Sequence, residues 1–302
     1  MIFPKNLKVG DTIGIIAPAS PFTKYSLEDI TVGFKDLGYK IKFGDSVTKS
    51  YKGYLAGPDE IRAKDIENMF LDSEVDAILC IRGGYGTPRL LDIIDYNIIA
   101  NNPKLFIGFS DITALHIAFN QIANLSTIHG IMAGNILEWD SFTYKSFIDA
   151  VTMKNKLEIT NPRNEKLYTL IKGKCAGEII GGNLSLLVAT MGSEYEINTK
   201  GKILFIEEVG ECIYRIDRML TQLSLAGKFD DCEGIIFGNF SDCNKNNLEE
   251  FEIIDILLDR VKKYNKPCIY NLQSGHCMPM ISIPLGTYCK LDATNKIIKL
   301  LK

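Results

Sequence analysis

The stretch KLFIGFSDITALHIAFNQIA, residues 104–123, contains the pattern that decides the fold class. Its apolar run LFIGF is typical of a strand that is buried on both faces of a sheet. The run ITALHIAFNQIA that follows has the spacing of a helix, and only Ser110 and Asp111 separate it from the strand. A buried strand that passes directly into a helix predicts a βα unit on a mostly parallel sheet.

The same alternation of short apolar runs and longer amphipathic runs continues along the chain. We expect strands within residues 12–19, 40–47, 75–84, 202–210 and 234–240, and helices within residues 26–38, 57–72, 213–227 and 248–264. Two closing strands are expected within residues 283–301, joined by a polar turn at Asp292 to Asn295. The sequence therefore predicts the α/β class.

The length of 302 residues predicts two domains, because a domain usually has about 100 to 200 residues. Residues 151–172 are polar and only weakly periodic, which favours a connecting segment. We therefore predict domains at residues 1–150 and 173–302, with a single large domain as the alternative.

Composition excludes several classes of partner. The chain has 34 Lys plus Arg and 37 Asp plus Glu, a net charge of −3, and the two signs are interspersed. We expect neither nucleic acid nor a membrane as a partner. Pro4 and Asp11 interrupt the start where a secretory signal would be apolar, and the eight cysteines form no CxxC pair. We expect a cytoplasmic protein with reduced thiols, without a zinc site or a disulfide framework.

Ser110 has two interpretations. Its place between a buried strand and a helix would raise its hydroxyl above the carboxyl edge of the sheet, where open α/β sheets bind ligands. The N–H groups of the helix that begins there could stabilise an oxyanion, so Ser110 is a candidate nucleophile. A serine that opens a helix is also commonly its N-cap.

A serine nucleophile needs a base, and the chain has three histidines. His116 lies six residues after Ser110, about 600° around a helix, so we expect it to point elsewhere and to pack in the core. His129 follows a predicted strand and could border the site or be structural. His276 lies in a Ser-, Gly- and Pro-containing loop, a kind of segment that often displays catalytic side chains.

An imidazole base needs a carboxylate that fixes its second nitrogen. Glu207 and Glu208 end an apolar strand. A carboxylate at this position is either exposed to water at the sheet edge or has a role in a functional site. Two-residue alternation places Glu207 on the face of Ile203 and Phe205, so we favour Glu207.

A glycine cluster, IRGGYGTPRLLD at residues 81–92, follows a strand and precedes a helix. It matches neither GxGxxG nor a P-loop, which argues against a nucleotide site. Glycines allow close approach of the backbone to a ligand and can present a second oxyanion donor beside the Asp111 N–H. The alternative is a tight βα turn without a role in binding.

Together these motifs resemble the LD-carboxypeptidase family of serine peptidases (S66), which includes muramoyltetrapeptide carboxypeptidases and microcin C self-immunity peptidases. The resemblance covers nearly the whole chain, through GDTIGIIAPAS, GYLAGPDEIRAKDIENMF, CIRGGYGTPRLLDIID, IGFSDITALH, IIGGNLSLL, ILFIEEVGECIYRIDRMLTQL, GIIFGNF and SGHCMPMISIPLG. It implies an N-terminal flavodoxin-like α/β domain and a C-terminal β-rich domain of barrel-like build.

The resemblance also implies a triad in which Ser110 of GFSD is the nucleophile, His276 of SGH is the base and Glu207 orients the base. Where the family commonly has Glu-Asp, this chain has Glu207-Glu208.

Further site residues follow from the same resemblance. Gly84 and Asp111 would supply the oxyanion N–H groups, and Asn183 of GGNL would line the substrate site. Arg82 or glycine-turn N–H groups would bind the terminal carboxylate of the substrate. A serine nucleophile implies no metal, and we expect no other cofactor.

The implied function is that of a cytoplasmic hydrolase of peptidoglycan recycling. It would release terminal D-alanine from murein tetrapeptides with diaminopimelate or lysine in third position, and it would act as a homodimer. The alternatives are a microcin-type peptidase, an α/β-hydrolase esterase and a non-catalytic binding module. Ile112 stands where the esterase motif GxSxG has glycine. Aromatic residues placed to stack a base would favour the microcin type, and the single tryptophan, Trp139, lies outside the motifs.

Overall fold

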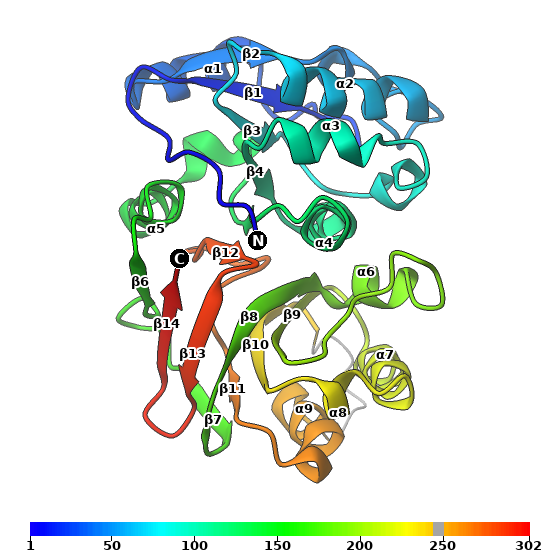
Figure 1. Cartoon of the computed structure of the whole chain (residues 1–302), viewed down its shortest axis with the longest axis vertical. Coiled ribbons are helices and arrows are strands. Elements are labelled where there is room, and N and C mark those ends of the chain that lie inside the picture. The colour runs from blue at the N-terminus through cyan, green and yellow to red at the C-terminus, as the bar shows by residue number, and fades with distance from the viewer. Residues whose placement is uncertain (244–250) are drawn as a thin grey trace. The chain divides into compact units, whose positions relative to one another are not determined.

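The computed structural model describes residues 1–243 and 251–302 (Figure 1). The chain forms two compact units. The first unit contains residues 1–154 and 282–284, and the second contains residues 155–281 and 285–302. Of the helix expected within residues 248–264, residues 248–250 lie outside the described residues.

The first unit is built on a six-stranded sheet with the order β12-β5-β4-β3-β1-β2. Its strands are β1 (Thr12–Ile16), β2 (Lys40–Phe43), β3 (Ala77–Cys80), β4 (Leu105–Gly108), β5 (Thr127–His129) and β12 (Ile283–Leu285). Strands β1 to β5 pair in parallel. The order 2-1-3-4-5 is that of flavodoxin, so the prediction of a flavodoxin-like α/β unit is confirmed.

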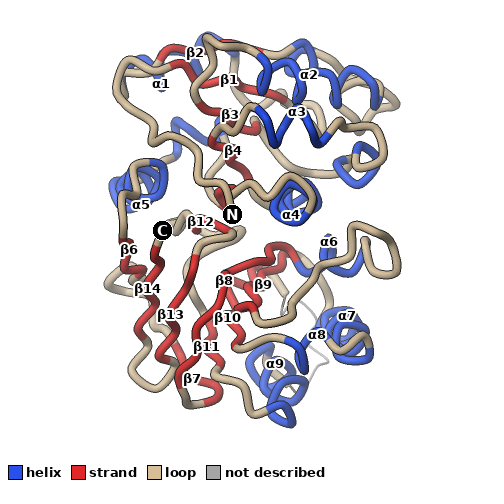
Figure 2. Tube along the Cα trace, viewed as in Figure 1, coloured by secondary structure: helices blue, strands red, loops and turns tan. Residues whose placement is uncertain are grey.

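Helices alternate with these strands along the chain, as Figure 2 shows in blue and red. They are α1 (Leu27–Asp36), α2 (Asp59–Leu71), α3 (Tyr96–Asn101), α4 (Thr113–Gln121) and α5 (Ser141–Val151). Helix α1 begins after Ser26, whose side chain forms a capping box with Asp29, and it buries Ile30 and Phe34. Among the described residues, no helix has both the length and the apolar character that crossing a membrane requires.

The second unit is built on an eight-stranded sheet with the order β6-β14-β13-β8-β9-β10-β11-β7. Its strands are β6 (Lys156–Ile159), β7 (Tyr168–Ile171), β8 (Lys174–Asn183), β9 (Lys202–Val209), β10 (Gly234–Ser241), β11 (Cys268–Tyr270), β13 (Tyr288–Asp292) and β14 (Ile297–Leu301). Strands β8 to β11 pair in parallel, and the outer pairs are antiparallel. Its helices are α6 (Leu184–Ala189), α7 (Ile213–Leu225), α8 (Lys228–Asp231) and α9 (Ile253–Val261).

The barrel-like build expected for this unit is wrong for the part of the chain that the structure describes. The sheet is open, and β6 and β7 lie at its two edges. A barrel requires its edge strands to pair with each other, and this pairing depends on residues far apart in sequence. The alternation of side chains within each strand is the same in an open and in a closed sheet.

The segment expected to connect two domains contains two short strands. Within residues 151–172, Lys156–Ile159 form β6 and Tyr168–Ile171 form β7. Both strands are short and only partly buried, because each lies at an edge of the sheet. Edge strands favour charged residues, which explains the polar composition of β6 and β7. Because of this composition, the local sequence did not indicate a strand.

Candidate active site

Ser110 follows β4 directly and opens a short 3-10 turn, Ser110–Ile112, that leads into α4. Its φ angle is +64°, in the left-handed region that costs a residue with a Cβ free energy. The N-cap positions of the turn and of α4 are Phe109 and Ile112, so the interpretation of Ser110 as an N-cap is wrong. A strained turn between a strand and a helix is the geometry that exposes a nucleophilic serine in other α/β enzymes.

The glycine cluster lies against this turn. A Cβ on Gly83 would be 3.0 Å from the Ser110 Cβ and 3.2 Å from its Oγ, so glycine allows the close approach. Gly84 has a φ of +111°, and the turn is fixed to the loop after β1 by two bonds. Ser20 N donates to Gly83 O at 3.3 Å, and Tyr85 N donates to Ser20 Oγ at 3.1 Å. The structure thus places the glycine backbone beside the serine hydroxyl.

Asp111 joins the two turns through its side chain, a role that the sequence did not reveal. The carboxyl group is 1% exposed, and its Oδ2 accepts a bond from Thr87 N at 2.8 Å. Thr87 Oγ1 donates in return to Asp111 O. Burial raises the pKa of Asp111 above its usual value, although bonds from Thr87 act in the opposite direction. Asp111 therefore fixes the end of the glycine turn relative to Ser110.

Arg62 of α2 is a second residue that sequence reasoning missed. Its side chain is fully buried, and Nη1 donates to Gly86 O at 3.0 Å and to Pro18 O, while Nε donates to Gly57 O at 3.2 Å. These carbonyls belong to the loops after β3, β1 and β2. An arginine early in an amphipathic helix gave no signal, because most such arginines lie in solvent.

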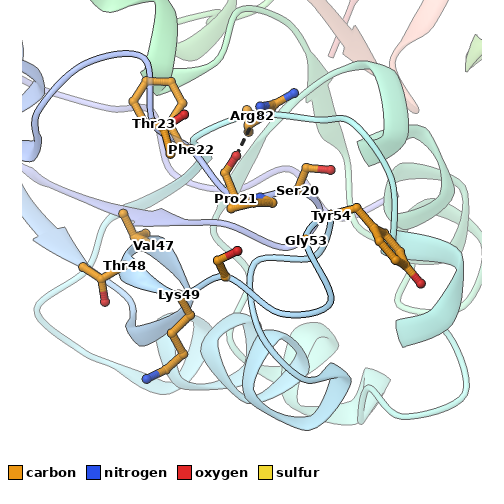
Figure 3. Close-up of a pocket in the computed structure, with 11 residues that line it drawn as sticks. Ser20, Pro21, Phe22, Thr23, Val47, Thr48, Lys49, Gly53, Tyr54 and Arg82 are labelled. Atoms are coloured by element: carbon orange, nitrogen blue, oxygen red, sulfur yellow. Dashed lines mark hydrogen bonds between the residues drawn. The ribbon is translucent and has the colours of Figure 1, made fainter.

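A pocket of about 550 Å³ lies beside the glycine turn (Figure 3). It is lined by Ser20, Pro21, Phe22, Thr23, Val47, Thr48, Lys49, Ser50, Gly53, Tyr54 and Arg82. Arg82 Nη1 donates to Pro21 O at 3.1 Å, which holds the guanidinium group at the rim. We name this space the β1–β2 pocket, because the loops after these strands form most of its wall.

In the second unit, the structure brings two of the predicted catalytic residues together. His276, in the loop after β11, has its Nδ1 2.8 Å from Oε2 of Glu207 in β9. Glu207 is 0% exposed. Gly275 has a φ of +122°, and a Cβ there would lie 2.6 Å from Glu207 Oε2, so glycine is required next to His276. A proton on Nδ1 satisfies the carboxylate and makes Nε2 the basic nitrogen.

The carboxylate also controls the ionisation of the imidazole. Burial lowers the pKa of His276, but the hydrogen bond and negative charge of Glu207, with the charge of Glu208, outweigh it. The pKa of His276 is therefore raised above the usual histidine value of 6.5. A raised pKa makes the imidazole a stronger base once it is neutral.

Glu208 bonds to a different set of groups. Its carboxylate accepts bonds from Asn183 Nδ2 at 2.9 Å, Ser185 N at 2.9 Å, Ser185 Oγ at 2.7 Å and Val209 N at 2.8 Å. Asn183 is buried and also caps α6, because its Oδ1 accepts a bond from Leu186 N at 3.3 Å. Glu207, and not Glu208, thus contacts His276, while Asn183 and Glu208 hold the strand ends around the pair.

The remaining histidines are buried in the first unit. His116 Nε2 donates to Gly108 O at 2.8 Å, and burial lowers the pKa of His116 to about 4. The ring of His129 is fully buried, with its centroid 5.9 Å from that of Phe109. Beside His276, burial raises the pKa of Cys277 to about 12, so its thiol is protonated at neutral pH. Within residues 1–243 and 251–302, no group of three or more His, Cys, Asp or Glu side chains could hold a metal ion.

Fold and side chains together define a class: an α/β protein with a strained serine turn after β4 in its first unit and a buried glutamate–histidine pair in its second unit. The sequence matches the family models for the LD-carboxypeptidase N-terminal domain over residues 13–130 and the LD-carboxypeptidase C-terminal domain over residues 176–291. The chain belongs to the LD-carboxypeptidase family.

Individual relatives match over almost the full chain. A probable murein peptide carboxypeptidase of Bacillus subtilis is 39% identical over 300 residues, which cover 97% of this chain and 92% of the relative. The microcin C7 self-immunity protein MccF of Escherichia coli is 30% identical, with coverage of 97% and 94%. The solved structure of muramoyltetrapeptide carboxypeptidase from Oxalobacter formigenes has a TM-score of 0.83 and 25% identity, with coverage of 96% and 97%.

Proposed function

We propose that this protein is a cytoplasmic serine-type LD-carboxypeptidase that releases terminal D-alanine from murein tetrapeptides during cell-wall recycling. The bond of 2.8 Å between His276 Nδ1 and the buried Glu207 carboxylate is the observation that supports it most strongly. The likeness to a murein peptide carboxypeptidase supports the substrate class.

In the proposed reaction, Ser110 Oγ attacks the carbonyl carbon of the third residue while His276 Nε2 takes the hydroxyl proton. The N–H groups of Gly84 and Asp111 stabilise the oxyanion. The C–N bond then breaks, and D-alanine leaves with the proton from His276. Water, activated by the same imidazole, hydrolyses the acyl-enzyme and restores Ser110.

An exopeptidase must also recognise the end of its substrate. We assign this role to Arg82, which precedes the glycine turn and has no carboxylate within 4.0 Å among the described residues. A guanidinium group binds a carboxylate through two parallel N–H bonds. We also propose that Asn183, whose side-chain amide donates to Glu208, lines the substrate site. We further propose that the protein is a homodimer. Light scattering during gel filtration would test this by giving the mass of the particle.

The second candidate is a microcin-type peptidase that acts on an aminoacyl nucleotide conjugate. Tyr54 and Tyr85 form an exposed pair beside the glycine turn, with ring centroids 6.0 Å apart and exposures of 45% and 49%. Exposed aromatic rings of this kind can stack on a base. Trp139 is unsuitable, because it packs against Phe34 and Phe147.

Mass spectrometry distinguishes the two functions. Purified protein would be incubated with a murein tetrapeptide and with an aminoacyl sulfamoyl adenosine, with Ser110→Ala as the control. The proposal predicts loss of one alanine from the tetrapeptide with wild type alone. Cleavage of the nucleotide conjugate without any change in the tetrapeptide would contradict it.

A further inference from the structure

His276 lies in a segment without regular secondary structure. The described residues 271–281, which follow β11, form no helix or strand. We name this segment the His276 loop. Its imidazole nevertheless lies with Nδ1 2.8 Å from the Glu207 carboxylate. Because a loop has no ladder of backbone bonds of its own, other parts of the chain must hold it in place.

The His276 loop is closed at its base. Ile281 N donates to Gln273 O at 2.6 Å, and Ser274 Oγ donates to Ile281 O at 2.8 Å. Gln273 and Ser274 are both buried. Residues 273–281 therefore form a closed loop that contains His276, and the position of its base decides where the imidazole lies.

Strand β10 holds the loop on one side. Leu272 N donates to Phe237 O at 3.2 Å, and Asn239 N donates to Ser274 O at 3.0 Å. In the sheet, β11 has β10 on one side and β7 on the other. The chain that enters β7 can therefore reach the loop from the side opposite to β10.

Asn161 makes this second contact from the connection between β6 and β7. Its Nδ2 donates to Asn271 O at 2.7 Å, and its Oδ1 accepts a bond from Gln273 N at 2.9 Å. One side-chain amide thus satisfies a carbonyl and an N–H group on the two sides of Leu272, as a neighbouring strand would. Asn161 is half-buried, which protects these bonds from water.

Asn271 bonds in the opposite direction. Its Nδ2 donates to Lys166 O at 2.9 Å, and its Oδ1 accepts a bond from Gln273 Nε2 at 2.9 Å. The φ angle of Asn271 is +70°, in the left-handed region that asparagine tolerates better than most residues. The two asparagines therefore join the β6–β7 connection to the first residues of the His276 loop.

We propose that Asn161 is a positioning residue that keeps the His276 imidazole bonded to Glu207. The inference rests on the proposed function in treating the imidazole as the base. Every contact that supports it lies within the second unit. Without the Asn161 amide, Gln273 N loses its partner and the loop can shift relative to β9. The segment that the sequence indicated as a connection thus has a role in the active site.

NMR titration of the His276 signals tests this role without any substrate. Glu207 and Glu208 of β9 are the charged groups that raise the pKa of His276, and the neighbouring Cys277 thiol is protonated at neutral pH. A looser bond to Glu207 removes part of this effect. Asn161→Ala therefore lowers the pKa of His276 from its raised value towards 6.5.

Asn295→Ala is the matched control. Asn295 lies in the turn between β13 and β14 of the same unit, and its Nδ2 donates to Asp292 Oδ2 at 3.0 Å. The substitution removes the same amide from a different turn. It leaves the pKa of His276 and the kcat for D-alanine release unchanged.

A double-mutant cycle separates positioning from a general loss of structure. Asn161→Ala lowers kcat about tenfold and changes KM little, because a misplaced base slows the chemical step without a lost substrate contact. In a Glu207→Ala background the same change lowers kcat less than twofold, since the bond that Asn161 maintains is already absent. A purely structural role would lower kcat by the same factor in both backgrounds.

Asn271→Gly is a second variant, which remains informative if Asn161→Ala fails to fold. Glycine adopts the φ of +70° without strain and lacks the amide that bonds to Lys166 O. Its pKa of His276 should also be lower than in wild type. An unchanged pKa of His276 in the folded variants, or equal losses of kcat in both backgrounds, would overturn the inference and leave D-alanine release intact. Absence of D-alanine release with wild type would contradict the proposed function, while the titration would still decide whether Asn161 positions His276.

Discussion

Ser110 adopts a backbone conformation that its side chain disfavours, with a φ of +64°. This conformation is almost free of strain for a glycine, whereas it costs an alanine about as much free energy as a serine, roughly 1 kcal/mol. We expect the unfolding free energy of Ser110→Gly to exceed that of Ser110→Ala by about 1 kcal/mol, so Ser110→Gly should unfold at a higher urea concentration. Both variants should be inactive. Urea unfolding followed by circular dichroism measures the difference, and equal stability of the two variants would contradict a strained turn.

Glu207 should control both the rate and the pH dependence. Because the pKa of His276 is raised, kcat/KM of wild type should rise with pH through a midpoint above 6.5. Glu207→Gln removes the negative charge that favours the imidazolium ion, so the midpoint should move to lower pH. The kcat should fall by about 10³- to 10⁴-fold, as when the orienting carboxylate of a serine triad is replaced.

Glu208→Gln serves as the matched control for this prediction. Glu208 accepts bonds from Asn183, Ser185 and Val209 and none of the described bonds joins it to His276. We expect a smaller loss of kcat than in Glu207→Gln, together with a clear loss of unfolding free energy. A larger kinetic effect at Glu208 than at Glu207 would show that the wrong carboxylate has been assigned.

At the scale of elements, Arg62 connects three loops at the carboxyl edge of the first sheet. Lysine cannot form the same fork of bonds, so Arg62→Lys leaves buried carbonyls unsatisfied at about 1 to 3 kcal/mol each. We expect lower unfolding free energy and lower kcat, with KM less affected because the glycine turn shifts relative to Ser110. Arg89→Lys, at the exposed partner of Asp59, is the control, and unchanged stability and rate in Arg62→Lys would refute this role.

Helix α4 is joined to the end of β4 by His116, whose pKa is lowered to about 4 by burial. The folded state favours the neutral ring, so this contribution to stability is fully present above the unfolded pKa of about 6.5. It falls as the pH drops from about 6.5 through 4, by about 3 kcal/mol in total. NMR titration of the imidazole signals provides the check, and titration of His116 near 6.5 would contradict it.

Local sequence patterns predicted most helices and strands. The features that the sequence did not predict depend on contacts between residues that are far apart in the chain. The βα unit at Ser110 and the capped helix at Ser26 were predictable because their signals lie within one stretch of chain. The edge strands β6 and β7, and the open form of the second sheet, depend on pairing with residues that are about a hundred positions away or further. The buried bonds of Arg62 and of Asp111 were equally invisible, since their partners lie in other loops.

At the scale of the whole molecule, the three side chains of the proposed triad are divided between the two units. The two family models together cover a chain in which Ser110 belongs to the first unit and the His276–Glu207 pair to the second. The proposed enzyme requires these three side chains to act in one reaction. Either unit alone should therefore lack activity, even where its own part of the site is intact.

Labelling with a fluorophosphonate probe tests this requirement most directly, because the probe reacts with a serine whose hydroxyl is activated by a base. We predict that wild type is modified at Ser110, with the site identified by peptide mass spectrometry, and that His276→Ala and Glu207→Gln reduce the labelling rate by orders of magnitude. Equal labelling of wild type and His276→Ala, or no labelling of Ser110 in folded protein that releases D-alanine, would contradict the proposed triad.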